Sequence, residues 1–111
     1  MKMGKNVDML IDDIVAVRLK GASPVAIRTA DAILADTEAE FGSGTSRGHL
    51  KMTVQRLGAE VIKSRPTNTS LRNAVKNTLY KIEKIDDEDD EKVLEVIRGN
   101  VAAFTETVNT A

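Results

Sequence analysis

Apolar residues recur every three or four positions along almost the whole chain, which is the spacing of an amphipathic helix. Leu50, Val54, Leu57 and Val61 give the clearest example, because their 4-3-4 spacing places all four on one stripe of a helix. No segment shows a clear alternation of apolar and polar residues, the pattern of a half-buried strand. The sequence therefore predicts an all-α fold of about five helices packed as a small bundle.

The predicted helices span about residues 7–20, 24–40, 46–64, 68–84 and 88–109. Local signals set their ends. Gly21 ends the first helix, Ser23 suits the N-cap of the second, and Pro24 suits its first turn, where a missing N–H costs nothing. Arg65 precedes Pro66, which favours extended geometry and ends the third helix.

The core should be aliphatic, because only 3% of the residues are aromatic and none is Trp. A chain of 111 residues can bury one small core but not two, so residues 1–111 are expected to form a single helical domain. The side chains expected to face that core are Val7, Leu10, Ile11, Ile14, Ile27, Ala30, Ile33, Leu34, Leu50, Val54, Leu57, Val61, Leu71, Val75, Leu79, Ile82, Val93, Ile97, Val101, Phe104 and Val108.

Composition excludes several kinds of chemistry. The chain has no cysteine, which excludes disulfides, thiolate catalysis and cysteine-ligated metals, and the single His49 cannot form a metal site alone. We expect no cofactor and no metal. No apolar run approaches the roughly 18–20 residues of a membrane span, and the N-terminus lacks the apolar stretch of a signal peptide, so a cytoplasmic protein without membrane contact is expected.

Two short stretches each place a basic residue just ahead of a helix start. They are Lys20, Gly21, Ala22, Ser23 and Pro24, and then Arg65, Pro66, Thr67 and Asn68. The free N–H groups of a helix start attract anions, Gly21 lets a phosphate approach the backbone, and Arg65 offers a planar fork to two phosphate oxygens. The pattern predicts a site for two phosphates, or a phosphate and a carboxylate. The same residues are also typical of plain helix junctions.

Charge is divided unevenly along a chain of net charge −1, since residues 1–85 carry +5 and residues 86–111 carry −6. The acidic run 86–91 is either a solvated connector or a docking surface or cation site. The glycine-rich segment 42–48 matches no phosphate-loop pattern, which favours a connector. Basic residues of the third and fourth helices could face nucleic acid. This partner is not expected, because there is no group of aromatic residues for base stacking and because residues 86–111, with a net charge of −6, would repel the phosphates.

Two segments resemble a known family. Gly58-Ala-Glu-Val-Ile-Lys-Ser-Arg-Pro-Thr-Asn-Thr-Ser-Leu-Arg-Asn-Ala-Val75 and Leu19-Lys-Gly-Ala-Ser-Pro24 are similar to the N-terminal helical domain shared by the regulatory (alpha, beta and delta) subunits of translation initiation factor 2B, ribose-1,5-bisphosphate isomerase and methylthioribose-1-phosphate isomerase. In the isomerases, the residues that match Gly21, Ala22, Arg65 and Pro66 line the sugar-phosphate site. Lys20 stands where the family usually has arginine, which replaces a fork by a point charge.

The resemblance also implies what this chain should lack. Family members continue into a Rossmann-like domain that carries the catalytic cysteine and aspartate, whereas this sequence stops at Ala111 and has no cysteine. We therefore expect a non-catalytic interaction or regulatory module whose partner is a protein, either a family subunit or a translation factor. The alternative is the sugar-phosphate-binding N-terminal part of an isomerase.

Overall fold

The computed structural model describes residues 4–15, 22–44 and 47–110. Its elements are α1 (Lys5–Val15), α2 (Ala22–Ser43), α3 (Leu50–Ser64), α4 (Thr69–Thr78), the 3₁₀-helix η1 (Ile82–Lys84) and α5 (Asp90–Thr110). The described residues contain no strand. The prediction of an all-α bundle of five helices is confirmed.

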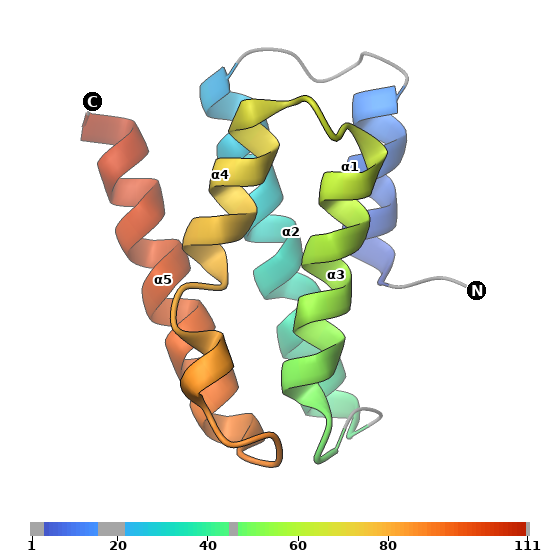
Figure 1. Ribbon diagram of the computed structural model, residues 1–111, viewed down its shortest axis with the longest axis vertical. Helices are drawn as coiled ribbons and strands as arrows, with labels where there is room; N and C mark the ends of the chain where they lie inside the picture. Colours follow the sequence, from blue (N-terminus) through green and yellow to red (C-terminus); the bar gives the residue numbers. More distant parts are fainter. Residues whose placement is uncertain (1–3, 16–21, 45–46, 111) are drawn as a thin grey trace.

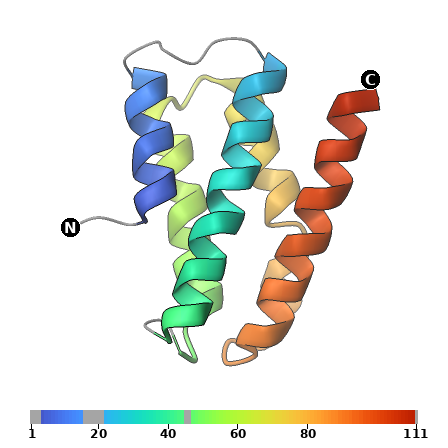
Figure 2. The same cartoon turned by 180° about the vertical axis from the view of Figure 1, so that it is seen from behind.

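The helices form two layers that run alternately up and down the bundle. Figure 1 shows α3 and α4 side by side in front, and Figure 2 shows α1, α2 and α5 forming the layer behind them. The central helix is α2, which contacts each of the other four α-helices. The end of α1 and the start of α2 therefore lie at the same end of the bundle as the α3–α4 junction, and the end of α2 and the start of α3 lie at the other end with the α4–α5 junction.

The core follows the predicted apolar stripes. Leu50, Val54, Leu57 and Val61 have no exposed surface, and they belong to one cluster with buried residues of all five α-helices. Ile11, Leu34, Leu79 and Phe104 pack against that cluster and are partly buried, while Ile27 and Val108 are also half-buried. The aliphatic core is confirmed, and it also includes Val25, Ala32 and Leu94, which the pattern did not single out.

The predicted fourth helix, 68–84, is wrong in its second half. α4 ends at Thr78, and Lys81 adopts a left-handed conformation with φ of 66° before η1 begins. The cause lies on α5, where the Asn100 side-chain amide donates 2.9 Å hydrogen bonds to the carbonyls of Thr78 and Tyr80. Ile82 is still 1% exposed, because the 3₁₀ turn returns it to the core.

Other helix ends also differ from the predicted ones. α1 begins at Lys5 rather than residue 7, and residues 16–20, which the prediction included, lie outside the described part of the chain. α2 begins at Ala22, so Ser23 lies inside its first turn rather than at the N-cap. α2 extends through Ser43 and α3 begins only at Leu50, so the connector between them is displaced toward the C-terminus.

Candidate functional site

The first half of the predicted anion site is described only in part. Lys20 and Gly21 lie outside the described residues. Ala22 is the first residue of α2, and Ser23 is exposed in its first turn. The start of α2 therefore lies one residue earlier than the predicted cap.

The second half lies at the α3–α4 junction, where Arg65, Pro66 and Thr67 are all exposed. The N-cap of α4 is Asn68, whose side-chain oxygen accepts a 3.1 Å hydrogen bond from the N–H of Leu71. This cap satisfies one of the free N–H groups of the helix start. Thr67 therefore precedes the cap and leaves its hydroxyl on the surface of the junction.

The fold brings the described parts of the two junctions to the same end of the bundle (Figure 1). The Arg65 guanidinium reaches toward α1, with its Nη2 atom 3.5 Å from the carbonyl oxygen of Ile14. The neighbouring Arg72 guanidinium donates to the carbonyl of Pro66, which ties the junction back to α4. Arg65 thus points across the end of the bundle toward the end of α1.

The opposite end is organised by Asp90. Its carboxylate accepts hydrogen bonds from the N–H groups of Gly48, at 2.7 Å, and Leu50, at 3.2 Å. His49 occupies the N-cap position of α3 but makes no side-chain capping bond. Asp90, 40 residues away in sequence from Leu50, therefore caps this helix in place of the adjacent His49.

Lys51 fixes the connector between α4 and α5. Its ammonium group donates to the carbonyls of Glu83 and Ile85, at 3.1 and 2.8 Å, and to the Asp87 carboxylate, at 3.0 Å. The three donors of the ammonium group are thereby all used, and only 14% of the Lys51 side chain is exposed. Lys51 therefore holds the residues that directly precede the acidic run 86–91 against the start of α3.

The carboxylates of residues 86–91 have different roles. Asp90 caps α3, Asp87 pairs with Lys51, and Asp89 accepts a 3.2 Å hydrogen bond from the N–H of Lys92 at the start of α5. Asp86 and Glu88 are exposed, and neither side chain makes a hydrogen bond or ion pair within residues 4–15, 22–44 and 47–110. These two carboxylates are free to meet a partner.

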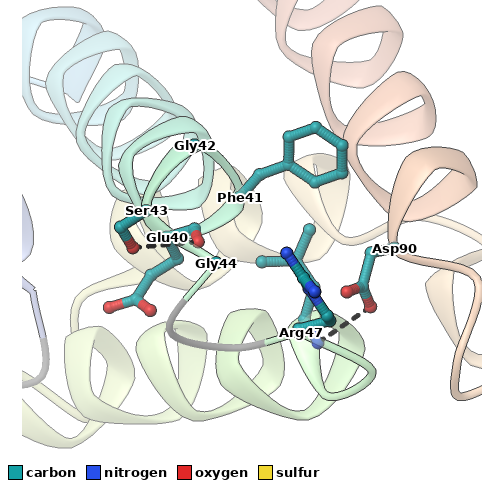
Figure 3. A pocket seen from close by; sticks show the side chains of 8 residues that line it. Glu40, Phe41, Gly42, Ser43, Gly44, Arg47 and Asp90 are labelled. Atoms are coloured by element: carbon teal, nitrogen blue, oxygen red, sulfur yellow. Dashed lines mark hydrogen bonds between the residues drawn. The ribbon is translucent and has the colours of Figure 1, made fainter.

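A hollow of about 370 Å³ lies beside Asp90, between the end of α2 and the starts of α3 and α5. Figure 3 shows Phe41, Arg47 and Asp90 around it, with the Asp90–Leu50 hydrogen bond drawn at its edge. Arg47 is exposed, and Phe41 keeps 39% of its surface exposed. The hollow combines one cation, one aromatic ring and a carboxylate already engaged by backbone donors.

The structural roles of Lys51, Asp90 and Asn100 were not predicted from the sequence. Each side chain satisfies backbone groups of a distant segment, so neither spacing nor local propensity identifies the partner. Asn100 did give one signal, because it lies next to the buried Val101 yet is polar. Asp90 stands among other carboxylates, and Lys51 is one of several lysines and arginines of its helix, so neither gives a signal.

Within the described ranges, no group of three or more His, Cys, Asp or Glu side chains is arranged to hold a metal ion. In the same part of the chain, no helix has the length and apolar character required to cross a membrane. Comparison with known proteins finds no matching family model, no similar curated protein and no similar solved structure.

Proposed function

We propose that the chain is a non-catalytic helical domain, related to the regulatory subunits of translation initiation factor 2B, that acts as an interaction module. The observation that carries the proposal is the acidic connector 86–91. Lys51 holds the residues just before it, through the carbonyls of Glu83 and Ile85, and pairs with the Asp87 carboxylate. Asp86 and Glu88 remain exposed and unpaired within the described chain. A surface fixed before binding loses less conformational entropy when a partner docks. The partner is a protein with a basic surface, for which the resemblance indicates a translation factor.

The charge pattern supports this reading of the connector. Asp89 and Asp90 accept hydrogen bonds from backbone N–H groups at the starts of α5 and α3. Negative side chains at a helix start stabilise the helix. Asp86 and Glu88 contribute no such contact within the described residues, so the fold does not explain them. Exposed carboxylates of this kind steer a basic partner and set its register.

The test is titration calorimetry of the chain against a purified regulatory subunit of translation initiation factor 2B. We expect a saturable complex that the double variant Asp86→Lys/Glu88→Lys weakens at least tenfold. The matched control is Asp12→Lys/Asp31→Lys, which reverses two exposed carboxylates on α1 and α2 and should change the affinity less than twofold. Absence of a complex, or equal weakening by both double variants, contradicts the proposal.

A second function, binding of a sugar phosphate, is favoured by the position of the start of α2 at the same end of the bundle as the α3–α4 junction. Arg65 is exposed there and lies 3.5 Å from the Ile14 carbonyl. Amide chemical shifts during titration with inorganic phosphate test it, and they should move at residues 21–25 and 65–70. Arg65→Ala should abolish these shifts and Arg56→Ala should leave them unchanged. Small shifts scattered over the whole chain would contradict this function.

A further inference from the structure

The two-helix layer formed by α3 and α4 is strongly basic. Between Leu50 and Lys81 the sequence has seven Lys and Arg residues and a single carboxylate, Glu60. One of the seven, Lys51, is engaged by the connector. The other six are all exposed, namely Arg56, Lys63, Arg65, Arg72, Lys76 and Lys81. A layer of this composition attracts a polyanion.

The cations are arranged along the two helices. Arg56 and Lys63 are seven residues apart on α3, and Arg72 and Lys76 are four residues apart on α4, so each pair lies on one side of its helix. Arg56, Lys63 and Lys76 form no ion pair within the described residues. α3 and α4 lie side by side in Figure 1, so these exposed cations belong to two neighbouring helices of one layer.

From the sequence, the net charge of −6 on residues 86–111 makes a nucleic-acid partner unexpected, because it would repel the phosphates. In the structure, α5 belongs to the other layer with α1 and α2 (Figure 2), and it packs beside α4. Asp90 is turned onto the backbone of α3, and Asp87 is paired with Lys51. The connector between α4 and α5 lies at the end of the bundle where α3 begins, whereas the end of α3 and the start of α4 lie at the opposite end.

An aromatic side chain accompanies the cations. Tyr80, just after α4, is 61% exposed, and the ammonium of Lys81 lies 5.2 Å from the centre of its ring. An exposed ring beside a basic surface is what single-stranded nucleic acid uses for base stacking, while cations hold its phosphates. An acidic protein segment would use the cations but would gain little from the ring.

We infer that the outer surface of α3 and α4 binds single-stranded nucleic acid, with Arg56, Lys63, Arg72 and Lys76 on the phosphates and Tyr80 stacked on a base. This inference uses a different surface and a different ligand from the proposed interaction with a protein partner, so either can fail without the other. It predicts that binding depends on salt, because each phosphate contact releases counterions.

The experiment measures fluorescence anisotropy of a labelled 20-nucleotide uridine RNA mixed with the full chain, at several salt concentrations. The triple variant Arg56→Gln/Lys63→Gln/Lys76→Gln should weaken binding at least tenfold at low salt and reduce the salt slope by about 2. The control Lys5→Gln/Lys84→Gln/Lys92→Gln removes the same charge from exposed positions elsewhere and should change affinity less than twofold. Circular dichroism of both triple variants confirms that each is folded.

A second pair of measurements separates nucleic acid from an acidic protein. Tyr80→Ala should weaken RNA binding about fivefold or more, and labelled polyglutamate of matched charge should bind more weakly than the RNA. Three results would overturn the inference: no RNA binding at low salt, equal losses in the two triple variants, or polyglutamate binding as tight as RNA together with no effect of Tyr80→Ala. The last of these would assign the surface to an acidic protein segment.

Discussion

The carboxylate of Asp36, on α2, accepts a 2.8 Å hydrogen bond from the backbone N–H of Val7, at the start of α1. Its other oxygen accepts from the N–H and the side-chain amide of Asn6, both at 2.9 Å. A side chain on one helix thus caps another, and Asp36 is only 3% exposed as a result. Gly4 lies so close that a Cβ atom there would collide with this carboxylate.

Replacing Asp36 by alanine should therefore destabilise the protein. The loss leaves the first N–H groups of α1 without acceptors, and loss of a cap costs about 0.5–2 kcal/mol. We expect the free energy of unfolding, measured with urea, to fall by about 2 kcal/mol. Asp31→Ala, on the exposed side of the same helix, should change it by less than about 0.5 kcal/mol. Equal effects of the two substitutions would show that the cap contributes nothing.

Two helical glycines should respond to alanine in opposite directions. A Cβ atom on Gly58 would lie 2.8 Å from Leu79 Cδ1 and 2.9 Å from Val75 Cγ1, whereas one on Gly99 would meet nothing within 4 Å. Gly58→Ala should lower the free energy of unfolding by about 1–3 kcal/mol through overpacking of α3 against α4. Gly99→Ala should raise it by up to about 1 kcal/mol through helix propensity. Thermal and urea unfolding of both variants test the pair, and stabilisation by Gly58→Ala would refute the close packing.

Lys81 should be replaceable by glycine with a gain in stability. Its φ of 66° lies in the left-handed region, which costs a residue with a Cβ atom about 1–2 kcal/mol. Glycine avoids this cost, because it has no Cβ atom. Its greater flexibility in the unfolded chain offsets part of the benefit, so we expect the free energy of unfolding to rise by about 0.5–1 kcal/mol. Lys84→Gly, a neighbouring position without positive φ, should instead lower stability. A loss in Lys81→Gly equal to that of Lys84→Gly would contradict the left-handed turn.

Lys51→Met should loosen the connector as well as destabilise the fold. The variant leaves the carbonyls of Glu83 and Ile85 without their charged donor, and hydrogen bonds to charged groups contribute about 1.5–3 kcal/mol. We expect a loss of that size, together with faster amide hydrogen exchange across residues 82–89. Lys92→Met removes an exposed lysine on α5 and serves as the control. Unchanged exchange in Lys51→Met would mean that the connector is held by other contacts.

The sequence predicted those parts of the fold that depend on periodicity. The stripe from Leu50 to Val61 is fully buried, and even Ile82, beyond the end of α4, was correctly assigned to the core. Helix ends were predicted less well, because their positions depend on partners distant in sequence. The Asn100 amide holds the end of α4, and Asp90 rather than His49 caps α3.

The candidate site was predictable to a similar extent. Local patterns located the exposed junction at Arg65 to Thr67 but misplaced the start of α2 by two residues, because Ser23 resembles a cap. The acidic run 86–91 was predicted to be a solvated connector, or else a docking surface or cation site, and the structure shows that its individual carboxylates have different contacts. That distinction required the position of Lys51, which no local pattern provides.

Hydrogen exchange of the chain, with and without a purified regulatory subunit of translation initiation factor 2B, shows where a partner protein docks. If the partner docks on the acidic connector, exchange should slow at residues 83–91 and at the adjoining start of α3, and should stay unchanged at the start of α2 and at the α3–α4 junction. Unchanged exchange throughout the chain, or slower exchange only at the start of α2 and at the α3–α4 junction, would contradict docking on the connector.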